Sequence, residues 1–128
     1  MKTDGDELLV NTIGSYTGTT AVGFRGEKAT AFIITAEGPW TVQVIPLEAI
    51  PRKPLPVQGS TDDVFIVEDA PGALPIACPG CTGNFAVWWY TANGADLLVN
   101  DVGAYQGTVY AKDLGIAVVT ADGAWSIG

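Results

Sequence analysis

Residues 94–109 read GADLLVNDVGAYQGTV, and residues 5–20 near the start of the chain read GDELLVNTIGSYTGTT. Nine of the sixteen aligned positions are identical. After a gap of four residues the match resumes, with residues 34–40 (ITAEGPW) aligned to residues 119–125 (VTADGAW). Self-similarity at a long fixed offset defines the repeating structural unit of a chain. Because residues 61–90 have no counterpart before the first copy, we expect one and a half units.

The periodicity of the chain is that of β-strands throughout. Apolar residues alternate or run together in residues 40–44 (WTVQV) and 85–90 (FAVWWY), and Gly and Pro mark turns between such runs. In the complete unit these signals predict strands near residues 64–68, 73–78, 85–92, 96–100, 107–112, 115–121 and 124–127. In the half unit they predict strands near residues 7–11, 18–24, 29–36 and 39–45. Many short strands with regular turns indicate an all-β fold, an antiparallel β-sandwich of jelly-roll or immunoglobulin-like kind, with little or no helix.

The chain divides at a proline-rich segment. Residues 46–56 contain four prolines, which exclude helix and interior strand and favour stiff, extended chain. We therefore assign residues 1–45 to the half repeat, residues 46–60 to a linker and residues 61–128 to the complete unit. We expect all three to pack together as one domain.

The half unit poses a stability problem. Its predicted strands have an apolar face that includes Trp40 and Val42, and such a face needs a covering sheet. The face can pack on the complete unit, or on the same face of a second chain in a two-fold dimer. Residues 61–90 can also complete either flanking copy, which would allow strands to exchange between chains. Trp40 and Trp125 hold equivalent positions, so we expect a core role for both.

The composition of the chain indicates which classes of partner are disfavoured. Of its 128 residues, 14 are acidic and 6 are basic, which gives a net charge of -8. Nucleic acids and anionic lipid surfaces require clustered Lys and Arg, so both are disfavoured. No apolar run approaches the about 20 residues of a membrane span, and the polar, acidic first residues do not resemble a signal peptide. We therefore expect no nucleic acid as a partner and no insertion into a membrane.

Signals for catalysis are also missing from the sequence. The chain has no His to act as a base, no Gly-x-Ser-x-Gly elbow, and no Gly-x-Gly-x-x-Gly or Walker pattern among its 16 glycines. Its acidic residues offer too many combinations for a glycosidase-type pair to be chosen. We therefore predict that the chain is not an enzyme and needs no cofactor for catalysis.

Cys78 and Cys81 enclose Pro79-Gly80 and allow three interpretations. A thioredoxin-like dithiol needs its first Cys at a helix N-terminus, whereas a turn and a strand follow here. A zinc knuckle needs four ligands, so only two chains that meet at this turn could complete the site with an inter-chain zinc ion. A tight Pro-Gly turn brings the two Cα atoms within about 5–7 Å, which permits a disulfide across a very short loop. A turn with a disulfide or two thiols is the simplest of the three.

Trp88, Trp89 and Tyr90 form an aromatic run on one predicted strand. Alternation places Phe85, Val87 and Trp89 on one face, and Trp88 with Tyr90 on the other. Both faces are therefore apolar, which indicates that the half unit or another subunit covers the second face. The alternative is a flat platform that stacks on a carbohydrate ring or a peptide, with Trp88, Trp89 or Tyr90 as ligand-binding residues.

Acidic residues gather in predicted turns, among them Asp62, Asp63, Asp96 and Asp101. Calcium prefers loops that are rich in carboxylate oxygens, so these four residues are candidate ligands of a structural calcium ion. None of them has the spacing of a twelve-residue calcium-binding loop, and acidic residues are also common in ordinary turns.

Three stretches, GNFAVW (residues 83–88), DLLVNDVGAYQGT (residues 96–108) and TADGAW (residues 120–125), resemble a tandem repeat of secreted or surface proteins of bacteria. That repeat is loosely similar to prepeptidase C-terminal-like β-sandwich appendages, and the resemblance covers nearly the whole chain outside the linker. It implies a β-sandwich, an extracellular or cell-surface setting and a non-catalytic role. It carries over no catalytic residue, and the cysteine turn departs from the usual repeat.

Together these observations predict a module for protein interaction or structural assembly. Its partner would be a second copy of the chain, as a homodimer, or a neighbouring protein domain. The competing hypotheses are a carbohydrate-binding module that uses the exposed aromatic residues, and a dimer joined by zinc or a disulfide through Cys78 and Cys81.

Overall fold

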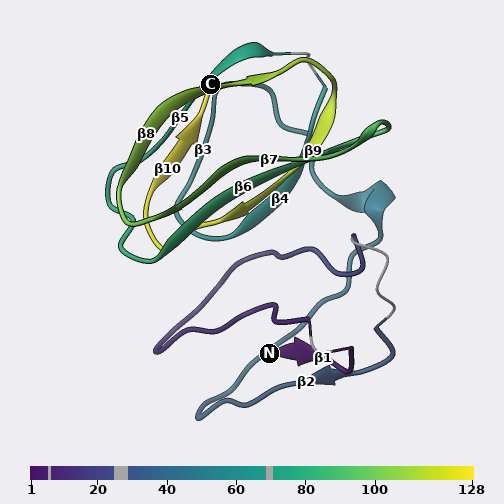
Figure 1. Cartoon of the computed structure of the whole chain (residues 1–128). Coiled ribbons are helices and arrows are strands. Elements are labelled where there is room, and N and C mark those ends of the chain that lie inside the picture. Colours follow the sequence, from purple (N-terminus) through teal and green to yellow (C-terminus); the bar gives the residue numbers. More distant parts are fainter. Residues whose placement is uncertain (6, 25–28, 69–70) are drawn as a thin grey trace.

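The computed structural model of the chain describes residues 1–5, 7–24, 29–68 and 71–128 (Figure 1). Within these residues it has ten strands and one short 3-10 helix. The strands are β1 (Lys2–Thr3), β2 (Phe32–Ile33), β3 (Val57–Gly59), β4 (Asp63–Val67), β5 (Gly72–Cys78), β6 (Asn84–Thr91), β7 (Gly94–Val102), β8 (Tyr105–Ala111), β9 (Gly115–Thr120) and β10 (Trp125–Ile127), and the helix is η1 (Leu47–Ala49). None of the described residues belongs to a helix of the length and apolarity that a membrane crossing requires.

Eight of the strands build two four-stranded antiparallel sheets that pack face to face. One sheet has the order β3-β10-β5-β8 and the other has the order β4-β9-β6-β7. All seven strands predicted for residues 61–128 are present, with boundaries shifted by one or a few residues. The prediction of an all-β antiparallel sandwich is confirmed.

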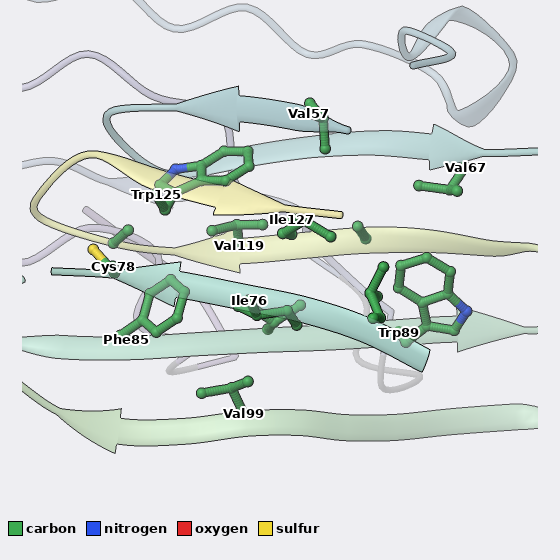
Figure 2. Packing of buried hydrophobic residues seen from close by; sticks show 14 of the residues in the cluster. Val57, Val67, Ile76, Cys78, Phe85, Trp89, Val99, Val119, Trp125 and Ile127 are labelled. Carbon is green, nitrogen blue, oxygen red and sulfur yellow. The ribbon is translucent and has the colours of Figure 1, made fainter. Parts of the chain in front are cut away.

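The core lies between the two sheets and is filled by large side chains from both (Figure 2). Trp125 on β10 stacks on Phe65 of β4 with ring centroids 5.9 Å apart, so this pair joins the two sheets. The Trp125 indole N–H also donates a 2.8 Å hydrogen bond to the Thr61 carbonyl, which satisfies its one polar group. Burial of each such side chain stabilises the fold by about 1.5–3 kcal/mol.

The proline-rich segment borders the sandwich. Arg52 pairs in parallel with Ile66 of β4, and the Lys53 N–H donates to the Ile66 carbonyl at 2.9 Å. Val57–Gly59, which the sequence assigns to the linker, forms the edge strand β3 beside β10. This is possible because no proline follows Pro56 in the segment, so residues 57–59 keep their N–H groups. Linker residues therefore add the edge strand of one sheet and hydrogen-bond to the edge strand β4 of the other.

Residues 1–45, termed the open copy below, do not form the four strands that the sequence predicts near residues 7–11, 18–24, 29–36 and 39–45. In the described part of the open copy the only strands are β1 and β2, which pair with each other over two residues. Figure 1 shows most of the remainder as two extended loops, purple and blue, beside the sandwich. The prediction of four strands is therefore wrong for this structure.

The strand order of the sandwich explains why these strands are missing. By sequence, the open copy holds counterparts of β7, β8, β9 and β10 only. In the complete unit β6 lies between β7 and β9, and β5 lies between β8 and β10. No two of the four counterparts are therefore neighbours in a sheet. A strand without a neighbour has no partner for its N–H and C=O groups, so no ladder forms.

Candidate functional site

The open copy exposes apolar side chains whose counterparts in the complete unit are buried. Trp40 is 58% exposed, whereas its counterpart Trp125 is 2% exposed. Val42 is 42% exposed, whereas its counterpart Ile127 is fully buried. The expectation of a core role is therefore wrong for Trp40, because residues 59–65, which cover Trp125, have no counterpart in the open copy. Phe32 and Ile33 are also exposed while their counterparts, Ala117 and Val118, are buried. Leu8 and Ile13 are exposed as well, but so are their counterparts Leu97 and Val102, and Val44 and Ile45 are two further exposed apolar residues.

The open copy is attached to the sandwich at Asp62. The Tyr16 hydroxyl donates a 2.7 Å hydrogen bond to the Asp62 carboxylate, and the Thr19 N–H donates to the Asp62 carbonyl at 3.1 Å. The second carboxylate oxygen accepts from the Ala121 N–H at 2.8 Å. Partial burial, followed by the hydrogen bond to Asp62 and the charge of that carboxylate, raises the pKa of Tyr16. Asp62 thus connects the open copy to two parts of the complete unit.

A cleft of about 390 Å³ lies between the open copy and the outer face of the β4-β9-β6-β7 sheet. Trp88 and Tyr90 stack along one wall with ring centroids 6.0 Å apart, and Phe24 of the open copy meets Tyr90 edge-on at 4.9 Å. The open copy therefore covers part of the outer face of β6, as the alternation of its residues led us to expect. The rest of the lining is made by Gly5, Glu7, Leu8, Leu9, Thr20, Ala21 and Val118.

Trp89 does not belong to this wall, because it faces the opposite side of β6. It is 1% exposed, and its indole N–H donates a 3.1 Å hydrogen bond to the Asp113 carbonyl. Val87 and Phe85, two and four residues before it, are fully buried with it between the sheets. Trp89 is therefore a core residue and cannot stack on a ligand, which leaves Trp88 and Tyr90 as the aromatic candidates.

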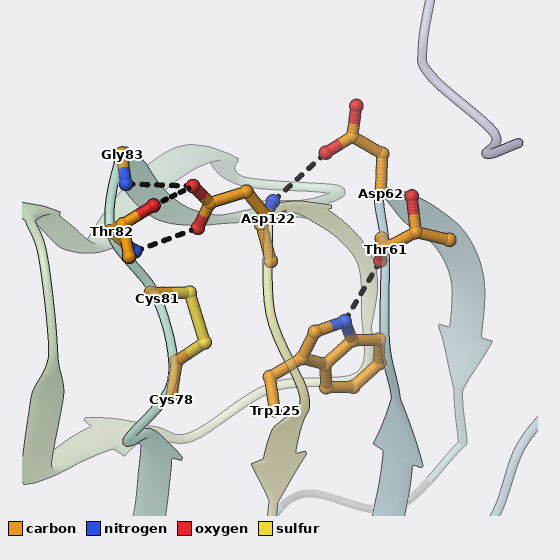
Figure 3. The surroundings of a disulfide bond; sticks show 9 residues. Thr61, Asp62, Cys78, Cys81, Thr82, Gly83, Asp122 and Trp125 are labelled. Carbon is orange, nitrogen blue, oxygen red and sulfur yellow. Dashed lines mark hydrogen bonds between the residues drawn. A yellow bond between two sulfur atoms is a disulfide. The ribbon is translucent and has the colours of Figure 1, made fainter. Parts of the chain in front are cut away.

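Cys78 and Cys81 form a disulfide within the chain, with their Cα atoms 5.5 Å apart across the Pro79-Gly80 turn (Figure 3). The Cys81 N–H donates to the Cys78 carbonyl at 3.3 Å, and both cysteines are buried. Of the three interpretations, the structure contains the disulfide turn. Since each sulfur has its partner in the same chain, this form does not link two chains, and zinc could bind here only after reduction.

Asp122 binds the segment that follows the cysteine turn, a role that the sequence did not predict. Its carboxylate accepts hydrogen bonds from the Thr82 hydroxyl at 2.7 Å, the Thr82 N–H at 2.9 Å and the Gly83 N–H at 2.8 Å (Figure 3). The two hydrogen bonds from Thr82 and then the one from Gly83 lower the pKa of this exposed carboxyl. The signal that could have found it is the repetition of Ala-acidic residue-Gly in both copies.

Gly123, which directly follows Asp122, occupies a position that only glycine fits. A Cβ atom at Gly123 would lie 2.8 Å from the backbone of Gly80, so the two turns touch through main-chain atoms. The counterpart in the open copy is Gly38, and a Cβ atom there would have no atom within 4 Å. The open copy thus repeats the residues of a turn-to-turn contact but lacks the turn on which they dock.

The four candidate calcium ligands do not gather at one place. Asp62 serves the junction described above, and Asp63 accepts a 2.7 Å hydrogen bond from the Lys53 ammonium group. Asp101 accepts from the N–H of the residue that follows it at 2.8 Å, and Asp96 lies at another position of the same strand, β7. Among the described residues there is no group of three His, Cys, Asp or Glu side chains that could hold a metal ion. The calcium prediction gains no support from this arrangement.

No family model, no curated protein and no solved structure matches the chain, so its resemblance to a bacterial tandem repeat stays a prediction.

Proposed function

We propose that the chain is a non-catalytic module for protein assembly, in which the sandwich is a stable platform and the open copy presents a surface to another polypeptide. The contrast between Trp40, 58% exposed, and its buried counterpart Trp125 carries this proposal. Contiguous apolar surface beside polar surroundings is typical of protein interaction sites. Trp125 has the same sequence context as Trp40 and is buried, so it indicates the environment that a bound partner could give to Trp40.

The disulfide supports an extracellular or cell-surface setting for this module. Disulfides form and persist in oxidising compartments and are rare in reducing ones. The bond between Cys78 and Cys81 closes a loop of very few residues within one chain. It therefore serves as a local clamp of the platform, while the surface for assembly lies on the open copy.

Light scattering after chromatography tests the proposal in its simplest form, in which a second copy covers the exposed surface. We expect the apparent mass to exceed 13.3 kDa and to rise with concentration. Replacing Trp40 and Val44 by Ser should return the mass to that of a monomer. Val102→Ser is the matched control, since Val102 is also exposed but lies on the complete unit. A mass that stays monomeric at every concentration would contradict assembly through a second copy.

A carbohydrate-binding module is the second candidate, because Trp88 and Tyr90 stack side by side along a cleft. Neighbouring aromatic rings offer a broad apolar surface, and such rings contribute much of the contact energy of binding sites. Tryptophan fluorescence across a panel of polysaccharides tests it. Trp88→Ala should abolish any change, whereas Trp40→Phe should preserve it. Indifference of the unmodified chain to the whole panel would remove this candidate.

A further inference from the structure

The disulfide turn and the attachment of the open copy lie on two sides of one short segment, residues 121–123 (Figure 3). On one side Gly123 lies against the turn, and Asp122 accepts three hydrogen bonds from the residues that follow the turn. On the other side the Ala121 N–H donates a 2.8 Å hydrogen bond to the Asp62 carboxylate. Residues 121–123 are termed the bridging segment below, because they contact both the turn and the residue that holds the open copy.

The contact between the bridging segment and the turn has no slack. A Cβ atom at Gly123 would lie 2.8 Å from the Gly80 carbonyl group and 3.0 Å from the Cys81 nitrogen. Gly123 therefore lies directly on the peptide group that joins Gly80 to Cys81. Main-chain atoms in close contact cannot change rotamer to give way, so a displacement of Cys81 is passed on to Gly123.

Reduction of the disulfide should produce such a displacement. Cys78 and Cys81 are buried and belong to the core cluster, whereas Pro79 and Gly80 between them are exposed. Two thiol groups need more room than a bonded pair of sulfur atoms, because atoms that are not bonded are held apart by van der Waals repulsion. A close-packed core does not offer that room, so we expect the turn to move towards solvent.

The bridging segment also positions the residue to which the open copy is attached. One carboxylate oxygen of Asp62 accepts from the Ala121 N–H, and the other accepts from the Tyr16 hydroxyl at 2.7 Å. Both oxygens belong to one planar group, so a shift of Ala121 turns the second oxygen away from its partner. The Thr19 N–H donates to the Asp62 carbonyl at 3.1 Å, and a Cβ atom at Gly18 would lie 3.2 Å from the Asp62 Cβ atom. The attachment is therefore packed closely around Asp62 and depends on its position.

We propose that the disulfide between Cys78 and Cys81 is a redox-sensitive latch for the open copy. With the bond closed, the bridging segment keeps Asp62 in place and the open copy stays attached to the sandwich. With the bond reduced, the turn shifts the bridging segment, and the hydrogen bonds between Asp62 and the open copy weaken. The latch acts whether or not a partner binds the open copy, so it is independent of the assembly function.

A dithiol reductant opens the latch by thiol–disulfide exchange. Its first thiolate attacks one cysteine sulfur, the bond between Cys78 and Cys81 breaks, and the other cysteine leaves as a thiolate. The second thiolate of the reductant attacks the resulting mixed disulfide and releases the first cysteine. The chain gains two electrons and two protons as two thiols, and the reductant is oxidised to a cyclic disulfide. In an oxidising compartment, exchange with a disulfide reagent runs in reverse and closes the latch.

Amide hydrogen exchange in the oxidised and the reduced chain, measured residue by residue by NMR, tests the latch. Dithiothreitol is the reductant, and a gain of two hydrogen atoms in the intact mass identifies the reduced chain. We expect exchange at Thr19 to quicken by about fivefold or more on reduction, because its N–H donates to Asp62. Asp4 is the matched control in the same copy, since its N–H donates to the Ala31 carbonyl. Its rate should change by less than about twofold.

Two variants separate the latch from a general loosening of the chain. In Tyr16→Phe the attachment is already weakened, so reduction should quicken exchange at Thr19 by less than about twofold. Gly123→Ala displaces the bridging segment while the disulfide stays intact, so it should quicken exchange at Thr19 in the oxidised chain. Gly38→Ala is the equivalent change in the open copy and should leave this rate unchanged.

Three results of reduction would overturn the latch. They are an unchanged rate at Thr19, an equal acceleration at Thr19 and Asp4, and an acceleration at Thr19 that is undiminished in Tyr16→Phe. The first shows no coupling, the second shows general loosening, and the third shows that the coupling does not pass through the attachment. If the reduced chain unfolds, Gly123→Ala in the oxidised chain decides, and an unchanged rate at Thr19 in that variant overturns the latch.

Discussion

The hydroxyl of Tyr16 donates a 2.7 Å hydrogen bond to the carboxylate of Asp62, and this bond joins the open copy to the complete unit. The counterpart of this tyrosine, Tyr105, packs instead on Phe85 of the core, with ring centroids 5.8 Å apart. One position of the repeat thus serves core packing in the complete copy and attachment in the open one. The attachment depends on a polar contact, so it responds to pH and to the loss of a single hydroxyl.

Tyr16→Phe removes the hydroxyl and should lower the free energy of unfolding by about 1 kcal/mol, since the bond has a charged acceptor but is partly solvated. The pKa of Tyr16 is raised in the folded chain, so its contribution is complete below the ordinary pKa of 10.0 and is lost as the pH rises further. The difference in the free energy of unfolding between the unmodified chain and Tyr16→Phe, measured with urea, should therefore be smaller above pH 10 than at pH 8. Tyr110→Phe, at an exposed tyrosine of β8, should leave stability unchanged at both values.

Asp122→Ala removes three hydrogen bonds at the disulfide turn. It should lower the free energy of unfolding by about 1–2 kcal/mol, a figure that is reduced because the carboxylate is exposed to solvent. Because the pKa of Asp122 is lowered by these bonds, its contribution is present above the ordinary value of 3.8 and is lost as the pH falls below it. Urea unfolding should give a clear difference in the free energy of unfolding between the unmodified chain and the variant at neutral pH, and a smaller difference near pH 3. Glu37→Ala changes the counterpart residue in the open copy and should have no effect at either pH.

Gly123→Ala and Gly38→Ala introduce the same methyl group at equivalent positions of the two copies. At Gly123 the new Cβ would lie 2.8 Å from backbone atoms of Gly80, so the turns must separate, at a cost of about 1–3 kcal/mol. At Gly38 nothing lies within 4 Å, so stability should change by less than about 0.5 kcal/mol. Thermal unfolding of both variants checks this, and equal losses would mean that the open copy already has its docking turn.

The sandwich itself was predictable, because its signals are local. Alternation in residues 84–91 separates core from surface along β6, and Gly and Pro mark the turns between strands. The tight cysteine turn was also predictable, since two residues cannot hold its ends far apart. Each of these inferences needs only residues close in sequence.

The state of the open copy was not predictable from the repeat. Sequence equivalence assigns Trp40 the role of Trp125, but burial of Trp125 depends on Phe65, which lies on a different strand sixty residues earlier in the chain. Strand order decides which segments need one another, and alternation carries no information about that order. The role of Asp122 was missed for the same reason, since its partner Thr82 lies 40 residues away.

Replacing Cys78 and Cys81 by Ala should lower the free energy of unfolding by about 2 kcal/mol, the value expected for a cross-link that closes so short a loop. The chain should stay folded, because the sandwich core has many other buried side chains. Urea unfolding compared with the unmodified chain gives the difference. Intact mass without reductant should show a monomer for both chains, and a reducible dimer of the unmodified chain would contradict the pairing within one chain.

Acrylamide quenching separates the exposed tryptophan from the buried ones. Trp40 is 58% exposed, Trp88 is half-buried, and Trp89 and Trp125 are almost completely buried, so the most readily quenched emission should come from Trp40. Trp40→Phe should remove that component, whereas Trp125→Phe should leave it and instead lower stability through loss of the hydrogen bond to the Thr61 carbonyl. If Trp40→Phe leaves the quenchable fraction unchanged at a concentration where light scattering shows a monomer, Trp40 is covered within its own chain, and the exposed surface on which assembly depends does not exist.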